Sequence, residues 1–208
     1  MRIDSLKTSP DRAGRYWVTF SDGSKLGLYR QTVEDFGLYT GLEMSEDQFS
    51  ALEKAAGQMS AKMRAVRIVS ASSVSKKDLE HRLIQKGEDP DQAKEAVQWM
   101  EDLHLVDDRN TAEQVVHSCI SKGYGLARAK QALYEKRIPK EYWDEALEDY
   151  PDQLEKIEAF LHSRLDADSD EKQIKRAIDA LIRRGHSYGK IKQALNNLSF
   201  DSEDYIED

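Results

Sequence analysis

From about residue 45 onward, apolar residues recur at spacings of three and four, which is the pattern of helices that bury one face. Ser45 followed by Gln48 forms a capping-box sequence and predicts the start of the first helix. The apolar stripe of this helix continues through Phe49, Leu52 and Ala56. We expect Gly57 to break or kink the helix, with the next one beginning near Ala61.

The same helical pattern occurs three times along the chain. Residues 65–83 align with 115–133 at an offset of 50 residues, and with 177–195 at a further offset of 62. Gly123 and Gly185 then coincide after the first helix of the later two copies, where a helix end often needs a left-handed backbone. This pattern predicts tandem copies of one helical unit.

The second helix of the unit repeats most literally. The tetrapeptide Lys-Gln-Ala-Leu occurs at 130–133 and again at 192–195. The apolar positions that coincide in all three copies are Leu79, Ala129 and Ile191, followed by Leu83, Leu133 and Leu195. Each unit is too small to bury its own apolar face, so we expect neighbouring units to stack in line.

A third helix completes the unit. Pro90 and Pro139 open it in the first two copies, because proline is tolerated in a first helical turn. In the last copy, Tyr205 takes the place of Trp143. Extra residues around 153–170 precede that copy and predict an added amphipathic helix. Its apolar positions are Leu154, Ile157, Phe160, Leu161 and Leu165.

The beginning of the chain has a different pattern. Arg15–Phe20 and Lys25–Tyr29 are short runs rich in aromatic and β-branched residues, separated by a Ser-Asp-Gly-Ser turn sequence. They predict a small β-hairpin. A two-stranded hairpin is marginal alone in water, so this one should pack on a helix or on a partner.

The predicted fold is mainly α, with three tandem three-helix repeats forming an elongated curved rod and a small N-terminal β-hairpin extension. The hairpin extension covers residues 1–42, a connecting helix 43–60, and the repeats 61–110, 111–151 and 152–208, the last with the added helix. A rod of this kind offers long surfaces and few deep pockets.

The composition agrees with a modest core and bears on where in the cell the protein acts. Hydrophobic residues make up 39% and charged residues 34% of the 208, which allows a core but not one large interior. No stretch approaches the ~20 uncharged apolar residues of a membrane-spanning helix, and no apolar run near the N-terminus suggests a secretory signal. The single cysteine, Cys119, cannot form an internal disulfide. We therefore expect a cytoplasmic protein that does not bind membranes.

Catalytic and metal-binding patterns are weak. The Gly-Tyr-Gly at 123–125 lacks the Lys and Ser or Thr of a phosphate loop, which favours a simple turn. Cys119 coincides with core positions of the other copies, which indicates a buried structural thiol. His186 stands in a turn and favours capping or packing, while Asp107–Asp108 favours a helix N-terminus over a cation site. We expect no enzyme activity, no cofactor and no metal.

Charge is unevenly distributed. The chain carries a net charge of −8, yet one stretch, 172–192, has seven basic residues against Asp179 alone. Such a stretch could attract phosphates or an acidic protein groove. It could equally be a solvated helix face balanced by the acidic residues 201–208.

Several motifs, in order, resemble the RecX family, regulatory proteins of bacterial RecA. They are the Ser75–Leu83 helix followed by Lys86-Gly87, the link Leu105–Ala112, the turn Lys122–Gly125, and Leu181–Ile191. The resemblance covers residues 60–198, and the N-terminal hairpin resembles an extension found in some members. The chain departs from the family at Thr111, where Phe is usual, and at Lys136-Arg137-Ile138, where Lys-Gly-Ile is common.

The resemblance implies a non-enzymatic modulator that binds along the RecA–single-stranded DNA filament and limits recombination and ATP hydrolysis. Contact with single-stranded DNA would be indirect or weak. The sequence leaves the oligomeric state open, and a monomer is the default expectation. The candidate contacts are the basic residues on the second helices of copies two and three and at the preceding turn: Arg128, Lys130, Lys136, Arg183, Arg184, Lys190 and Lys192.

Two other functions remain open. The basic stretch suggests an autonomous helical nucleic-acid-binding protein that needs no RecA. The repeat alone would also suit a scaffold that binds some other protein along its concave face.

Overall fold

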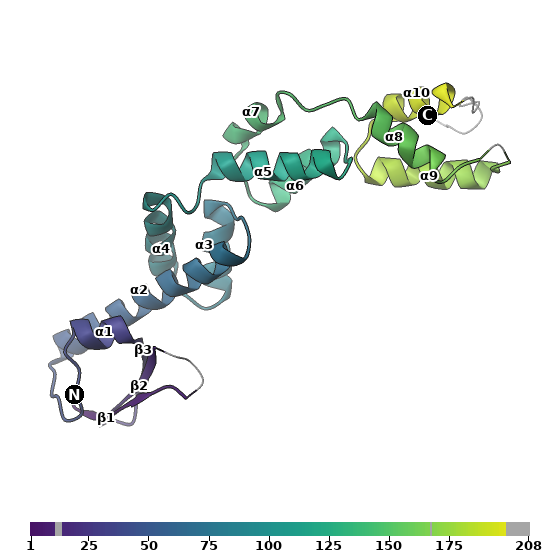
Figure 1. The fold of residues 1–208 in the computed structure, drawn as a ribbon. Coiled ribbons are helices and arrows are strands. Elements are labelled where there is room, and N and C mark those ends of the chain that lie inside the picture. The colour runs from purple at the N-terminus through teal and green to yellow at the C-terminus, as the bar shows by residue number, and fades with distance from the viewer. Residues whose placement is uncertain (11–13, 167, 199–208) are drawn as a thin grey trace. The chain divides into compact units, whose positions relative to one another are not determined.

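The computed structural model describes residues 1–10, 14–166 and 168–198 (Figure 1). The chain divides into two compact units, Met1–Asp107 and Asp108–Asp208. The described part is mainly helical with a small antiparallel sheet near the N-terminus, which confirms the predicted fold class. The helix expected around Tyr205 lies outside the described residues.

The sheet of the first unit has three strands, where the sequence predicted two. β1 (Ile3–Thr8), β2 (Arg15–Phe20) and β3 (Lys25–Tyr29) pair antiparallel in that order. The predicted hairpin is β2–β3, and the Ser24 amide donates to Asp22 Oδ1 at 2.9 Å in its turn. The hairpin is therefore confirmed as part of the sheet. The additional strand β1 was not predicted, because it has only two apolar residues, too weak an alternation to indicate a strand.

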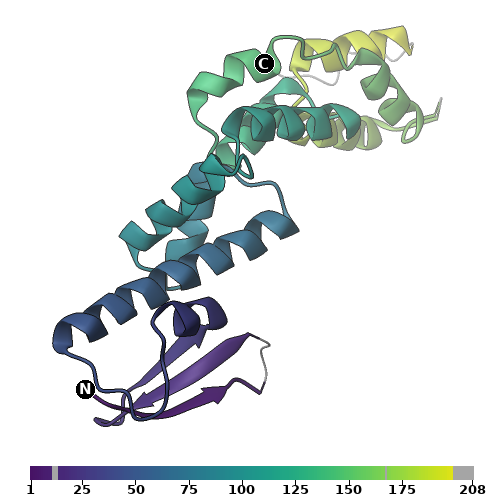
Figure 2. The ribbon, with the colours of Figure 1, turned by 60° about the vertical axis from the view of Figure 1, so that its left-hand side comes forward.

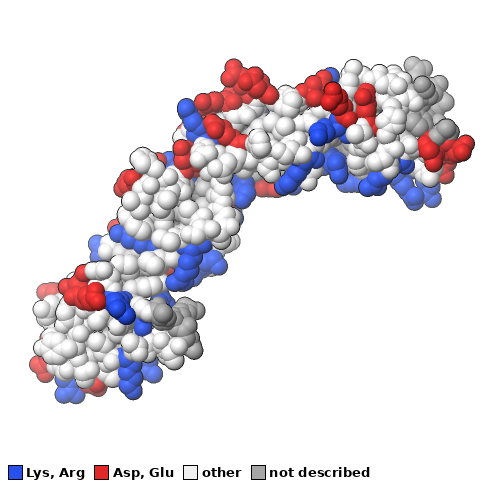
Figure 3. All heavy atoms as spheres, viewed as in Figure 1, with Lys and Arg blue, Asp and Glu red and all other residues white. Residues whose placement is uncertain are grey.

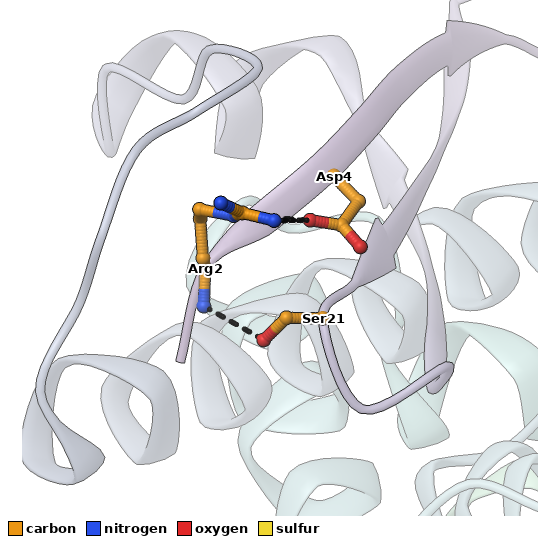
Figure 4. Close-up of polar contacts among 3 residues, drawn as sticks. All are labelled: Arg2, Asp4 and Ser21. Carbon is orange, nitrogen blue, oxygen red and sulfur yellow. Dashed lines mark hydrogen bonds and ion pairs between the residues drawn. The ribbon is translucent and has the colours of Figure 1, made fainter.

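β1 is held at the sheet by contacts at its start (Figure 4). The Arg2 amide donates to Ser21 Oγ at 3.3 Å, and its guanidinium forms an ion pair with Asp4 at 3.0 Å. The pairing register shifts between Ile3 and Ser5, which leaves Asp4 as an extra residue in the strand. The bulge lets Ile3 face the core while the rest of β1 keeps its register.

One face of the sheet packs on helices. Its buried side chains include Val18, Phe20 and Leu28, and they join Leu52 and Ala56 of helix α2 (Glu46–Ala71) in one cluster. The Phe20 ring meets the Phe49 ring edge-on, with centroids 5.0 Å apart. The short helix α1 (Arg30–Asp35) follows β3 and contacts both β2 and β3. The hairpin therefore packs on a helix, as its marginal size required.

Helix α2 is continuous, which corrects the prediction of a break at Gly57. It runs unbroken for 26 residues, and Figure 2 shows it as one long helix. It begins with the predicted capping box of Ser45 and Gln48. The place of a Cβ at Gly57 is occupied by the side-chain amide of Gln92. The glycine therefore makes room for a neighbouring helix, and the gain in packing outweighs its low helix propensity.

The second half of α2 forms a three-helix layer with α3 (Lys76–Gln85) and α4 (Pro90–Asp102). Pro90 stands in the first turn of α4, and Asp89 caps that helix by accepting from the amides of Asp91 and Gln92. The buried core of this layer is Ala61, Ala65, Ile68, Val74, Leu79, Leu83, Ala93, Ala96, Val97, Met100 and Val106.

The second unit starts with α5 (Asp108–Ser121) and α6 (Leu126–Glu135), followed by the 3-10 helix η1 (Lys140–Tyr142) and α7 (Trp143–Leu147). Next come α8 (Leu154–His162), α9 (Glu171–Arg183) and α10 (Tyr188–Asn197). The added helix predicted between 153 and 170 is α8, whose buried Ile157 and Leu161 join the core of α9 and α10.

Burial confirms the register of the repeat. All six coinciding positions of the second helices are 0% exposed: Leu79, Leu83, Ala129, Leu133, Ile191 and Leu195. Arg137 adopts a left-handed φ of +56°, at the position where Gly87 of the first copy has +87°. The turn geometry is therefore kept even where this chain lacks the glycine.

Candidate partner-binding surface

The clearest feature of the second unit is a row of basic side chains along α9. Four of them lie on one side of the helix, at spacings of three, one and seven residues: Lys172, Lys175, Arg176 and Arg183. The opposite side carries the buried Ile174, Ala177, Ile178 and Leu181. This surface, called the α9 basic face below, includes one acidic residue, Asp179.

The α9 basic face is open. All four basic side chains are exposed, and among the described residues none of them has an ion-pair partner. Figure 3 shows Lys and Arg side chains gathered along the side of α9 that is lowest in that view. No carboxylate of the described residues pairs with these charges, so they leave a local positive potential of the kind that attracts anionic groups.

The seven predicted contact residues divide into two groups. Arg128 forms an ion pair with Glu135 at 3.0 Å, and Lys190 forms one with Asp152 at 2.5 Å. The Arg184 guanidinium lies 4.7 Å from the centre of the Phe160 ring. These three already have neighbours that hold them in place.

The remaining predicted residues are placed differently. Lys136 occupies the C-cap of α6, at the far end of that helix from Arg128. Lys130 and Arg183 are exposed and Lys192 is half-buried, and within the described ranges these three have no ion-pair partner. Only Arg183 of the seven lies on the α9 basic face.

Sequence reasoning left three members of that face, Lys172, Lys175 and Arg176, out of the candidate contacts. The helical period could have found them, because residues at i, i+3, i+4 and i+11 from Lys172 share one side of a helix. The candidates were chosen instead from the second helices, where the repeat was most literal.

Two turns of the second unit meet through their backbones. The Gly125 amide donates to the Arg184 carbonyl at 2.9 Å, and the Ala127 amide donates to the Gly185 carbonyl at 3.3 Å. A Cβ on Gly125 would collide with the Gly185 carbonyl, and one on Gly185 would collide with the backbone of Arg128. The two glycines therefore allow the start of α6 to lie against the turn between α9 and α10.

Buried polar groups fasten the same junction. His186 is 8% exposed, and its Nε2 lies 3.0 Å from the Gly123 carbonyl. The Tyr150 hydroxyl donates to the Tyr124 carbonyl at 2.6 Å. Burial lowers the pKa of His186 and raises the pKa of Tyr150 to about 12, so both are neutral near pH 7. The packing role predicted for His186 is confirmed.

The junction brings Lys130 of α6 and Lys190 of α10 to one hollow of about 510 Å³. Asp152 and Gln153 also line it, and the Lys190 hydrogen bond lowers the pKa of the Asp152 carboxyl. Of the two lysines in this hollow, Lys130 is the one without an ion-pair partner among the described residues.

The single cysteine and the metal-ligand residue types bear on catalysis and metal binding in the described part of the chain. Cys119 is buried, and burial raises the pKa of its thiol, as expected for a structural cysteine. Within residues 1–10, 14–166 and 168–198, no three His, Cys, Asp or Glu side chains are grouped to hold a metal ion. Over the same residues, no helix combines the length and apolar character needed to cross a bilayer.

Comparison with known proteins finds the same family that the sequence motifs resemble. The family described as RecX, second three-helix domain, matches residues 107–147. Regulatory protein RecX of Clostridioides difficile (strain 630) is 25% identical over 98% of this chain and 97% of its own length. Regulatory protein RecX of Vibrio parahaemolyticus is 26% identical over 73% of this chain and 98% of its own.

Solved structures give the same fold. A crystal structure of regulatory protein RecX superimposes with a TM-score of 0.62 at 20% identity, covering 94% of this chain and 98% of the other. RecX from Lactobacillus salivarius gives 0.60 at 24% identity, covering 70% and 98%. The resemblance to the RecX family is thus confirmed across nearly the whole chain.

Proposed function

We propose that this chain, which resembles RecX regulatory proteins over nearly its whole length, is a non-enzymatic cytoplasmic regulator of the RecA recombinase. It would bind along the RecA–single-stranded DNA filament as a monomer and limit ATP hydrolysis and strand exchange, in recombination, repair and the SOS response. The observation that carries this proposal is the match of both chains over 97–98% of their lengths to a protein named regulatory protein RecX.

The α9 basic face supports a specific mode of contact. Its four exposed basic side chains lie on a helix whose other side is buried, so they are held in a fixed row. A row of fixed positive charge fits an acidic protein groove or a phosphate backbone without the entropic cost of ordering a loop. We propose that this face, with Lys130 and Lys192, is the main contact, and that Arg128, Arg184 and Lys190 position it.

The test is RecA ATP hydrolysis on single-stranded DNA with increasing amounts of this protein. The wild type should inhibit, and the double variant Arg176→Glu/Arg183→Glu should need about tenfold more protein for the same effect, equivalent to about 1.4 kcal/mol. Lys94→Glu is the matched control, because Lys94 is an exposed lysine on α4 of the other unit.

The outcomes separate cleanly. No change in hydrolysis with a stoichiometric excess of wild-type protein would reject the regulatory function. Inhibition that is equally weakened by the α9 variant and by Lys94→Glu would keep the function and reject the α9 basic face as its contact.

The same face favours one alternative, an autonomous nucleic-acid-binding protein. Its four unpaired basic side chains would then bind DNA without RecA, and log affinity would fall steeply with log salt. Titration of a labelled oligonucleotide at two salt concentrations, with the α9 variant alongside, distinguishes this alternative from a RecA-dependent contact.

A further inference from the structure

The outer face of the N-terminal sheet is uncovered. Cross-strand pairing places Lys7, Trp17 and Gly27 side by side on this face, with Arg15 and Tyr29 paired next to them. The opposite face carries the buried Val18, Phe20 and Leu28 of the core. Helix α1 and the first half of α2 pack with that buried face, so the outer face is left to solvent.

An aromatic ring lies flat on this uncovered face. Trp17 is 49% exposed, although large aromatic side chains usually bury most of their surface. A Cβ on Gly27 would lie 3.2 Å from the six-membered part of the indole, so the ring extends over the glycine of the neighbouring strand. One side of the indole is therefore against the sheet, and the other side is free to stack.

Basic groups surround the ring. Lys7 and Lys25 are exposed on the outer face. The Arg15 guanidinium lies 4.3 Å from the centre of the Tyr29 ring, and Arg67 of α2 donates to the Tyr29 hydroxyl at 2.8 Å. The buried Nε of Arg15 has no hydrogen-bond partner among the described residues.

Acidic groups do not balance this charge. The described strand positions that pair across the outer face are Ser5, Lys7, Arg15, Trp17, Thr19, Lys25, Gly27 and Tyr29, and none is a carboxylate. Asp4, the bulge residue of β1, is held by Arg2. In a chain with a net charge of −8, it is unusual that every charged residue at these described strand positions is basic.

We propose that this face binds single-stranded nucleic acid, with a base stacked on Trp17 and the phosphates on Lys7, Lys25 and Arg67. Stacking on an open indole favours an unpaired base, because a duplex hides its base faces, and basic side chains around an aromatic ring are the usual platform for single strands. A protein ligand is less well matched, since the other described strand positions of this face are polar, basic or glycine, apart from Tyr29. The inference goes beyond the proposed function and requires no RecA.

The test measures binding of fluorescein-labelled oligothymidylate to the full chain by anisotropy, without RecA. Trp17→Ala should lower affinity by about 5- to 150-fold, the range found for removal of one stacking residue. Lys25→Glu should lower affinity and flatten the dependence of log affinity on log salt by about one. Addition of unlabelled oligomer should quench tryptophan fluorescence in the wild type, and Trp17→Phe should lose that part of the quenching.

Matched controls keep the result specific. Tyr39→Ala removes a 60% exposed aromatic residue of the same unit that lies outside the strands, and it should bind as the wild type does. A blunt duplex of the same sequence should bind more weakly than the single strand. Oligouridylate run in parallel identifies whether DNA or RNA is preferred, and binding of either supports the platform. If Trp17→Ala unfolds, the comparison rests on Trp17→Phe and Lys25→Glu.

The proposal would be overturned if the wild type did not bind single strands, if the wild type and Trp17→Ala bound with equal affinity, or if Trp17→Phe left the quenching unchanged. If Trp17→Ala bound RecA more weakly but bound the oligonucleotide as the wild type does, the proposal would also be overturned. The face would then be a contact for a protein. None of these outcomes depends on whether the protein inhibits RecA.

Discussion

At the scale of single residues, two turns of the second unit can meet only because two glycines there have no side chain. Gly125 and Gly185 bring backbone against backbone, and any side chain there would occupy space that a carbonyl or an amide already fills. The alignment of Gly123 with Gly185 predicted a left-handed turn, and both residues have positive φ. The contact between the turns was beyond prediction, because its hydrogen bonds join residues 59 and 58 apart in the sequence.

Gly185→Ala should destabilise the second unit by about 2–4 kcal/mol, because it adds a left-handed backbone penalty to a steric clash with Arg128. Gly189→Ala is the control, since Gly189 lies in α10 with nothing within 4 Å of a Cβ, and it should be neutral or stabilise by up to about 1 kcal/mol. Urea unfolding followed by circular dichroism measures both. A cost below about 0.5 kcal/mol for Gly185→Ala would contradict the backbone contact.

His186 should make the stability of the second unit depend on pH. Burial lowers its pKa in the folded state, so the unfolded state binds the proton more readily. The stabilisation is complete above the ordinary histidine pKa of about 6.5 and is lost as pH falls through the lower folded value. Stability measured from about pH 7.5 to 5 should therefore fall more steeply in the wild type than in His186→Gln.

Gln keeps a donor that can reach the Gly123 carbonyl but cannot take up the proton. Parallel curves for the two proteins over this range would show that His186 does not titrate with unfolding.

The candidate contacts show that a basic residue's type does not reveal whether its charge is free or paired. Arg128, Arg184 and Lys190 read as free charges in the sequence, yet Glu135, Phe160 and Asp152 hold them. Two of those partners lie more than 20 residues away along the chain. Periodicity on one helix is local, so it could have selected the α9 basic face, whereas long-range pairing requires the fold.

At the scale of elements, the helices that bury a repeated apolar stripe were the most predictable. The second helices of the three copies are α3, α6 and α10, and their coinciding positions are all fully buried. The added helix α8 was also visible in its apolar spacing. Strand β1 was not, because a mostly polar edge strand takes its structure from pairing with β2 and hardly from its own pattern.

Leu133→Ala tests the repeat directly. Leu133 is 0% exposed in the core with Ala112, Val116 and Ile138, so its truncation should cost about 2–5 kcal/mol in denaturant unfolding. Tyr134→Ala, at the next position of α6, removes a 69% exposed side chain and should cost far less. Similar costs for the two variants would mean that α6 presents another face to the core.

At the scale of the whole molecule, the mean charge is a poor guide to binding. A net charge of −8 gives no sign of an anionic partner, yet both units hold a surface where basic side chains dominate. The basic stretch at 172–192 was visible in the sequence. The structure divides it into an open row on α9 and, beyond that row, Arg184 and Lys190, which have partners. The sheet face was not visible, because Lys7, Trp17 and Lys25 are brought together only by strand pairing.

Helix α2 belongs to two hydrophobic clusters at once. Leu52 and Ala56 complete the cluster beneath the sheet, and Ala61 and Ala65 complete that of the three-helix layer. Its 26 residues span about 39 Å without interruption, so one continuous helix connects the two clusters. If the sheet unfolded, the first half of α2 would lose the apolar contacts that bury one of its sides. An isolated half of this helix is too short to stay helical in water. The sheet and the first repeat should therefore melt as one block, and a ligand that steadies the strands would also delay unfolding of α3 and α4.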